Sequence, residues 1–482
     1  MALGDVGQLA RLDAGVARAL GARLTALDLG AAHAFVDDAP PQLATAFRPI
    51  RRYHLRGVDP TSIALKLWVY REPVPEDQAR LALGDVPLEP LIEAGLLVRV
   101  DETLASPFSL SFSEGMFFFG DELGDGGDAV MALGLFTLEM MRATWCDQRV
   151  ERVLDLGCGA GAVALYLAAV AERAIGTDIN PRAAVFGAFN ATLNGVANAE
   201  FRVGDLFAPM AGERFDLILS QPPFLPRPEG SIDATYMFGG PRGDELPLRA
   251  LAETPAHLTE TGRAVMIIQW GVFDDESVAA RIRKVLPEDV DLLVLEAPSR
   301  SLDDAAIGDA LTAYPGLGPA YEDSVLRRRA HYDALGCRSL VDTVVVVART
   351  TARHGFTGTT RIERLEKGRC TRAHVDSLLA AHALASASDA ALLDAHPSLP
   401  RGTAFVPEDE GFSAVFPGGA LHERVPVTAT AKDVLQLVAG ARDLRAATKL
   451  FAQRHKVSAS VATEQLLSFV RTALRSGLLE LR

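Results

Sequence analysis

The middle of the chain, roughly residues 149–350, alternates short apolar runs with stretches in which apolar residues recur every three or four positions. The apolar runs are rich in valine, isoleucine and leucine, as expected of strands buried on both faces. Strands that alternate with helices predict an α/β fold with a mainly parallel sheet. The seven predicted strands are RVLDLG (152–157), RAIGTDI (173–179), AEFRVGD (199–205), FDLILSQ (215–221), RAVMIIQW (263–270), VDLLVLEA (290–297) and VDTVVVVAR (341–349).

Both ends of the chain show helical periodicity instead. Residues 7–27 have apolar positions at helical spacing, and residues 59–100 predict three short helices, the second ending near Ala82, followed by a strand. Residues 430–482 predict two or three amphipathic helices and a short strand. Both orders of elements resemble a winged helix.

These patterns predict three domains. They are an N-terminal helical, winged-helix-like domain (1–108), a Rossmann-like catalytic domain (109–352) and a C-terminal mixed, winged-helix-like domain (353–482). A long polar segment, residues 299–340, separates the last two predicted strands of the catalytic domain. An insertion of that length predicts a lid or binding loop, or else a disordered tract. His331 and Tyr332, within it, are interpreted as helix surface residues.

Composition and charge narrow the class of protein. The chain has 482 residues, 49% hydrophobic and 23% charged, which is typical of a soluble globular protein with more than one domain. It contains no apolar run long enough to span a bilayer and no signal peptide at its N-terminus, so we expect a cytoplasmic protein with no membrane partner. The net charge of −14 disfavours nucleic acid as a partner. The four cysteines (Cys146, Cys158, Cys337 and Cys370) and the ten histidines are scattered, which predicts reduced thiols and no metal site.

A glycine-rich turn follows the first predicted strand in the sequence VLDLGCGAGAVALYLA (153–168). Gly157, Gly159 and Gly161 permit a backbone conformation that side chains disfavour, and they let a ligand approach the start of the next helix. Dinucleotide-binding enzymes use a similar turn, so the glycines alone identify no cofactor. The acidic residue Asp155, at the junction of strand and turn, separates the two cases.

The motif LDLGCGAG resembles the first motif of class I S-adenosylmethionine-dependent methyltransferases. The resemblance implies that Asp155 lies near the amino group of the cofactor's methionine part, and that Asp178 accepts hydrogen bonds from both ribose hydroxyls. It also implies that Asp205 binds the adenine amino group, with Leu206 or Phe207 packed beside the ring. Asn180, predicted to cap the helix after the second strand, belongs to the same predicted site. Each acid alone is equally well explained as a loop cap, but three acids at consecutive strand ends, in the family's order, predict an S-adenosylmethionine site.

Residues 112–141, ahead of the first strand, resemble the segment that covers the cofactor in glutamine, adenine and guanine N-methyltransferases. The resemblance implies an entrance loop in which Phe119 contacts the cofactor. Phe117, Phe118 and Phe119 also fit a buried core, and Asp128 also fits a helix cap. The spacing to the glycine turn favours the entrance loop.

The motif QPPF, Gln221–Phe224, ends the fourth predicted strand. It resembles the (N/D/S)PP(Y/F) motif of methyltransferases that modify planar amide or amino nitrogens, including the release-factor glutamine and rRNA small-domain enzymes. The resemblance implies that the first side chain and a proline carbonyl accept hydrogen bonds from the nitrogen while the aromatic ring packs on the planar group. Gln221, Pro222 and Phe224 are therefore the candidate catalytic residues. Gln221 departs from the pattern by one methylene, and its amide can either accept from an N–H or donate to a carboxylate.

The segment YMFGGPRGDELPLRAL (236–251) resembles a GG…DG segment of the release-factor glutamine methyltransferases. The resemblance implies that Arg242 and Asp244 shape the acceptor pocket. Arg227 and Arg242, near the amide, are also candidates for binding an anionic acceptor. Surface arginines that pair with acidic neighbours explain each of them equally well.

These features favour an S-adenosylmethionine-dependent methyltransferase that acts on an oxygen or nitrogen of a small molecule, such as a carboxylate or amide of a natural-product intermediate. A second hypothesis keeps the chemistry and takes a protein glutamine or an rRNA base as the acceptor. A third is a non-catalytic, cofactor-sensing regulator whose terminal domains bind DNA. The negative charge and the lack of an evident basic stripe count against nucleic acid, and a homo-oligomer stays open.

Overall fold

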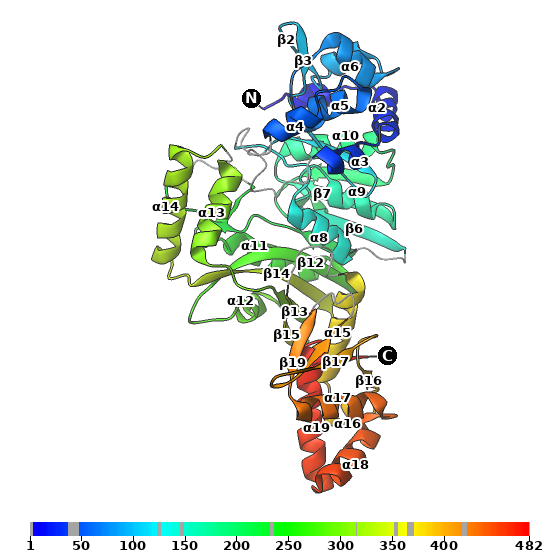
Figure 1. The fold of residues 1–482 in the computed structure, drawn as a ribbon, viewed down its shortest axis with the longest axis vertical. Helices are drawn as coiled ribbons and strands as arrows, with labels where there is room; N and C mark the ends of the chain where they lie inside the picture. The colour runs from blue at the N-terminus through cyan, green and yellow to red at the C-terminus, as the bar shows by residue number, and fades with distance from the viewer. Residues whose placement is uncertain are drawn as a thin grey trace.

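The computed structural model of the protein describes residues 3–36, 48–122, 127–144, 149–231, 236–314, 316–350, 355–363, 371–416 and 422–481. The molecule is elongated, and its N-terminal region, central sheet and C-terminal region follow one another along the longest axis (Figure 1).

The centre is an eight-stranded sheet with the order β15-β13-β14-β12-β9-β6-β7-β8. β14 runs antiparallel to both of its neighbours, and the other neighbouring strands are parallel. All seven predicted strands are present, and the predicted α/β, Rossmann-like fold is confirmed. The eighth strand, β15, extends the sheet beside β13. The strands are β6 Val150–Leu156, β7 Ala171–Asp178, β8 Ala199–Val203, β9 Phe215–Ser220, β12 Leu258–Val272, β13 Val290–Glu296, β14 Ser339–Arg349 and β15 Thr357–Arg361.

Helices cover both faces of this sheet. In β14, Val344, Val345, Val346 and Val347 are all fully buried, because side chains that alternate between the faces meet helices on both sides. One face packs against α11 (Glu245–Glu253) and α12 (Val278–Val285). The other packs against α8 (Leu135–Thr144), α9 (Ala162–Leu167) and α15 (Arg372–Ser386).

The carboxyl ends of the parallel strands β6, β7, β8 and β9 meet at one edge of the sheet. Two further features lie after strands that end there. The short strand β10 (Leu225–Pro226) follows β9 and pairs with β11 (Phe238–Gly240). A helical hairpin, α13 (Leu302–Ala313) and α14 (Pro319–Ala334), follows β13 and protrudes to one side in Figure 1. The alternative of a disordered tract at residues 299–340 is therefore wrong, and Tyr332, interpreted as a surface residue, is buried.

The N-terminal region packs on α10 (Pro181–Leu193), the helix between β7 and β8. A Cβ added to Gly21 would lie 2.0 Å from the carbonyl oxygen of Leu193, so glycine is required where the two helices touch. The predicted order of short helices and strands is present, and β1, β3 and β2 form a sheet in that order. The likeness to a winged helix stays a prediction. The elements are α1 Val6–Leu9, α2 Ala14–Ala26, α3 Leu29–Val36, α4 Arg48–His54, α5 Pro60–Ala64, a π-helical turn Leu65–Val69, β1 Val74–Pro75, α6 Glu76–Leu83, α7 Leu88–Glu93, β2 Val98–Val100, β3 Thr103–Ala105, β4 Ser109–Ser113 and β5 Met116–Gly120.

The C-terminal region forms its own hydrophobic core beyond α15. The predicted amphipathic helices are present as three helices, α17 to α19, followed by the short strand β20. Here too the winged-helix likeness stays a prediction. The elements are α16 Asp389–Leu393, β16 Pro397–Ser398, β17 Ala404–Glu408, β18 Gly411–Val415, β19 Arg424–Val427, α17 Ala429–Gly440, α18 Leu444–His455, α19 Ala459–Arg475 and β20 Glu480–Leu481.

Within the described ranges, the helices are all too short or too polar to cross a bilayer. Cys158 and Cys337 are buried free thiols, whereas Cys146 and Cys370 lie outside the described residues.

Candidate active site

The glycine turn after β6 adopts the conformation that the sequence predicts. The backbone angle φ is +78° at Gly157, +51° at Gly159 and +85° at Gly161, all in the left-handed region that favours glycine. The N–H groups of Gly157 and Cys158 donate to the carbonyl of Thr177 at 2.8 and 2.9 Å. The turn is thus held against the end of β7.

Two of these glycines have different surroundings. A Cβ added to Gly161 would lie 2.6 Å from the Phe201 ring, so packing against β8 requires glycine there. A Cβ added to Gly157 would meet nothing within 4 Å. Open space therefore lies in front of the turn, where a ligand can approach the backbone.

Two carboxyl groups flank the turn. Asp178 accepts hydrogen bonds from the N–H groups of Gly159 (3.0 Å) and Asn180 (2.8 Å), and Asp155, which is 3% exposed, accepts one from Ala164 (3.0 Å). Burial, together with the charge of Asp178, raises the pKa of Asp155 to about 7, and burial raises the pKa of Asp178 as well. A positively charged ligand would favour both carboxylates, and each oxygen of Asp178 has a second lone pair for a hydroxyl. These residues fit the ammonium, sulfonium and ribose of S-adenosylmethionine.

Cofactor affinity is expected to rise with pH as Asp155 loses its proton. In the cofactor-free protein, the pKa of Asp155 is raised, so its protonated form stabilises the fold. This contribution is complete below the ordinary pKa of 3.8 and is lost as pH rises through about 7. An ammonium beside Asp155 favours the carboxylate, so binding below pH 7 releases a proton and weakens by up to about tenfold per pH unit. Calorimetric titration at about pH 6 and 7.5, below the pKa of an ordinary α-amino group, measures this effect.

The variant Asp155→Asn is the control, because it keeps the side-chain shape and removes the titrating group. Its cofactor affinity should be weaker and nearly independent of pH over the same range. Equal affinity of the wild-type protein at both pH values would contradict the prediction.

Residues 127–132 cross the glycine turn. The side-chain amide of Asn180 donates to the carbonyl of Asp128 at 2.9 Å, and the N–H of Ala160 donates to the carbonyl of Met131 at 3.4 Å. Asn180 also caps α10, as predicted, by accepting the N–H of Arg182 at 3.0 Å. The upstream segment therefore lies beside the turn, in the position expected of an entrance loop.

The prediction for Phe119 is corrected, because its side chain is fully buried and its ring meets the Trp68 ring edge to face at 5.4 Å. The ring has no exposed surface with which to contact a cofactor. The amide of Asn190, in α10, binds both the N–H and the carbonyl of Phe119, at 2.8 and 2.9 Å, and also donates to the carbonyl of Ala160 at 3.0 Å. Asn190 was not among the predicted residues, although a polar residue among the apolar positions of a buried helix was a signal.

Asp205 follows β8, at the third strand end. Its carboxylate forms an ion pair with Arg249 of α11, and both side chains are about half exposed. Leu206 has a φ of +45° and is half-buried, whereas Phe207 is buried and its ring stacks on His257 with 4.4 Å between centroids. The adenine contacts of Asp205 and Leu206 stay a prediction.

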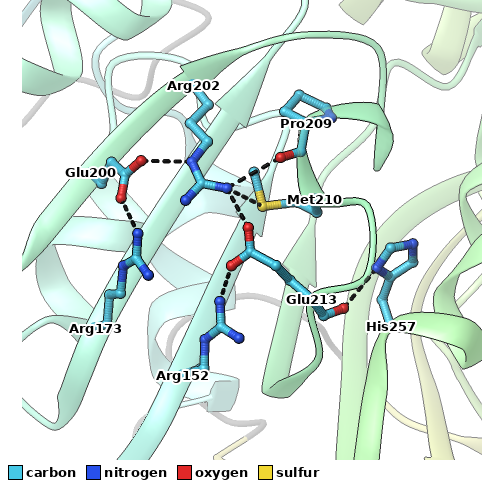
Figure 2. Close-up of polar contacts among 8 residues, drawn as sticks. All are labelled: Arg152, Arg173, Glu200, Arg202, Pro209, Met210, Glu213 and His257. Carbon is cyan, nitrogen blue, oxygen red and sulfur yellow. Dashed lines mark hydrogen bonds and ion pairs between the residues drawn. The ribbon is translucent and has the colours of Figure 1, made fainter.

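A charged network next to the loop that follows Asp205 fixes the position of this loop (Figure 2). Glu213 accepts hydrogen bonds from Arg152 and Arg202, and Arg202 also donates to the carbonyl of Pro209 at 3.1 Å. His257, whose ring stacks on Phe207, lies with Nδ1 3.0 Å from the carbonyl of Glu213. The network thus joins β6, β8 and the loop after Asp205. Its other members in Figure 2 are Arg173, Glu200 and Met210.

The motif Gln221–Phe224, here called the acceptor shelf, lies at the same edge. Gln221 is half-buried, and its amide has no hydrogen-bond partner among the described residues. A Cβ added to Gly239 would lie 2.6 Å from the carbonyl oxygen of Pro223, and one added to Gly243 would lie 2.4 Å from that of Phe224. Residues 238–243 therefore lie directly on the backbone of the shelf. This contact fixes the backbone and leaves the Gln221 amide available to a ligand.

The three predicted substrate-binding residues have different surroundings. Arg227 and Arg242 are exposed, with their guanidinium groups 5.5 Å from the ring of Phe238 and 4.4 Å from the ring of Phe273. Asp244 is buried in an ion pair with Arg281, 2.6 Å between Oδ2 and Nη1. The carboxylate of Asp244 thus serves as the counter-ion of Arg281. Acceptor binding by the two arginines stays a prediction.

Sequence analysis also overlooked Ile179, which follows Asp178 and is 62% exposed. Its branched apolar side chain is left in solvent directly after Asp178, at the end of β7. It is a further candidate for contact with a flat cofactor ring.

Known proteins resemble this chain most clearly in the region of the site. The family model described as methyltransferase small domain matches residues 135–238, and one described as a domain of unknown function (DUF7059) matches residues 44–106. A Methanocaldococcus jannaschii protein, named as a protein N5-glutamine methyltransferase, is 34% identical over 142 residues, which are 28% of this chain and 71% of the relative. The chain belongs to the class I S-adenosylmethionine-dependent methyltransferases. The predicted cofactor, S-adenosylmethionine, is thereby confirmed.

Other relatives of this methyltransferase match over shorter shares of their length. A release factor glutamine methyltransferase of Cereibacter sphaeroides is 38% identical over 142 residues, 27% of this chain and 50% of the relative. Ribosomal RNA small subunit methyltransferase C of Alcanivorax borkumensis is 29% identical over 126 residues, 25% of this chain and 34% of the relative. The chain thus spans half or less of the length of these two relatives.

Proposed function

We propose that this methyltransferase transfers a methyl group from S-adenosylmethionine to the side-chain amide nitrogen of a glutamine in a protein. The observation that carries the proposal is the acceptor shelf, where the Gln221 amide stands beside two prolines at the end of β9. Two of the relatives are named as glutamine methyltransferases, which also supports it. The relatives favour the second hypothesis of the sequence analysis over its first, the small-molecule acceptor.

The sheet places the shelf beside the glycine turn. β9 and β6 are neighbours, and their register pairs Ser220 with Leu156. Gln221 and Gly157 directly follow these two residues, so they leave the sheet at the same level from strands about 4.8 Å apart. The acceptor group and the cofactor would therefore be held next to each other.

The chain's own residues would position the acceptor. S-adenosylmethionine supplies an electrophilic methyl group on its sulfonium. The Gln221 oxygen would accept one N–H of the acceptor amide, and the half-buried Phe224 would pack on its plane. Transfer would form an N–C bond and break the C–S bond, with the electrons of that bond staying on the sulfur, and the proton released from the acceptor nitrogen would pass to water. Proximity and alignment supply the catalysis.

Charge argues against the DNA-binding regulator. If the N-terminal region were a winged helix, α7 would be the helix that enters a groove. It carries Glu89 and Glu93 and no lysine or arginine. In the C-terminal region, α18 carries basic residues, but two of them, Arg445 and Arg454, pair with Asp394 and Asp433. The net charge of −14 adds no overall attraction to DNA.

The test is to incubate the purified protein with tritiated S-adenosylmethionine and, in parallel, a release factor, ribosomal subunits and a small-molecule extract. Label is expected in the release factor, at a glutamine located by peptide mass. A variant with Asp178→Asn, which weakens the cofactor site, should give no label. Label confined to ribosomal RNA or to small molecules would overturn the proposal.

A further inference from the structure

The helical hairpin of α13 and α14 contacts both loops that form the acceptor side of the site. Nη1 of Arg327 donates to the carbonyl of Gly230 at 3.1 Å, in the segment that follows the acceptor shelf. Nε2 of His331, one turn further along α14, lies 2.9 Å from the carbonyl of Pro241, in the segment 238–243 that lies on the shelf. One helix thus touches both loops.

Arg328 lies between these two contacts on α14 and is only 3% exposed. Its guanidinium is 5.6 Å from the ring of Phe238, close enough for a cation–π interaction, and Arg227 approaches the same ring at 5.5 Å. Phe238 pairs with Leu225 in the β10–β11 ladder, directly after Phe224 of the shelf. The Phe238 side chain therefore stands between Arg328 and the residue that follows the acceptor shelf.

Buried polar groups of the hairpin hold Arg328 in turn. Its Nε donates to Oγ of Ser324 at 3.3 Å, and the carboxylate of Asp309, on α13, interacts electrostatically with its charge. The hydroxyl of Tyr332 donates to Asp309 at 3.0 Å. Burial raises the pKa of Tyr332 well above its ordinary value, so the hydroxyl keeps its proton at neutral pH. The orientation of Arg328 is thus set from both helices of the hairpin.

We propose that Arg328 is a positioning residue that fixes Phe238, and through it the acceptor shelf, so that the α13–α14 hairpin determines how tightly the acceptor binds. The inference rests on the proposed function in one respect, the identity of the acceptor. The hairpin follows β13 and lies outside residues 135–238, which match the methyltransferase small domain.

The decisive variant is Arg328→Lys, which keeps a positive charge near Asp309 but loses the planar guanidinium that lies 5.6 Å from the ring of Phe238. The Michaelis constant for the release factor is expected to rise about tenfold, with kcat within about threefold and cofactor affinity unchanged. Phe238→Leu should have the same effect, because it removes the aromatic partner of Arg328. Arg329→Ala is the matched control. Arg329 neighbours Arg328 on α14, but it pairs with Asp303 and Asp333, which both belong to the hairpin itself.

Hydrogen exchange gives a second measurement that needs no acceptor. The N–H groups of Leu225 and Arg227 donate to the carbonyls of Met237 and Gly240, both at 2.9 Å. These two amides should exchange at least about tenfold faster in Arg328→Lys than in the wild type, with Arg329→Ala unchanged. If the release factor is not the acceptor, the exchange result still decides the role of Arg328. Unchanged exchange in Arg328→Lys would overturn the proposal, and so would an unchanged Michaelis constant for an acceptor that the wild-type protein methylates.

Discussion

Replacing Gln221 by alanine is expected to slow methyl transfer about 100-fold while leaving the affinity for S-adenosylmethionine unchanged. In the proposed function the Gln221 amide binds the acceptor N–H, and losing one positioned hydrogen-bonding group in an active site costs on the order of 100-fold or more. Cofactor binding should persist, because Asp155, Gly157 and Asp178 belong to β6, β7 and the turn between them. Single-turnover rates with saturating cofactor, together with calorimetry, separate the two effects.

Gln221→Asn tests whether the methylene that Gln221 has beyond the Asn of the family's motif affects the rate. The shorter side chain matches the family's motif but withdraws the amide by about 1.5 Å, and a misplacement of that size costs about tenfold or more. The backbone has no freedom to compensate, since Gly239 and Gly243 lie against the carbonyls of the shelf. Gln453→Ala, at an exposed position of α18, is the matched control. Wild-type rates in Gln221→Ala would remove Gln221 from the mechanism.

Except for β8, whose sequence AEFRV is at most half-buried, the predicted strands could be found from the sequence because each contains an apolar run that is buried in the structure. β15 was not predicted for the opposite reason. Its sequence TGTTR is short and polar, with exposed and buried positions in alternation, and it lies at the edge of the sheet. Only pairing with β13 makes it a strand, and such pairing between distant segments leaves little trace in local sequence.

In the candidate site, too, features set by the local chain could be predicted, whereas contacts between distant residues could not. The glycines of the turn could be predicted because their positive φ values are a property of the local chain. The partners of the charged residues could not. Arg281 lies 37 residues after Asp244 and Arg249 lies 44 residues after Asp205, and only the fold brings each pair together. Phe119 shows the reverse error, since its spacing to the glycine turn favoured an entrance loop, and only its packing against Trp68 shows that it belongs to the core.

Asp244→Ala is expected to lower the free energy of unfolding by about 3–5 kcal/mol, because it leaves the guanidinium of Arg281 buried without its counter-ion. Both side chains are 8% exposed. Burial already lowers the pKa of Arg281, and the carboxylate of Asp244 opposes that shift. The carbonyl of Gly271 still accepts a hydrogen bond from Arg281, but a neutral group does not balance the charge. Urea unfolding of the two proteins at neutral pH measures the difference.

The double variant Asp244→Leu/Arg281→Leu separates this structural role from the acceptor role that the sequence suggested. Replacing both members of a buried ion pair by apolar residues is often nearly neutral, so most of the lost stability should return. If Asp244 only holds α11 against α12, the double variant should also bind the acceptor as the wild type does. A stable double variant with weakened acceptor binding would show instead that Asp244 shapes the acceptor pocket. Acceptor affinity of the double variant thus distinguishes the two roles, whereas its stability should be restored under both.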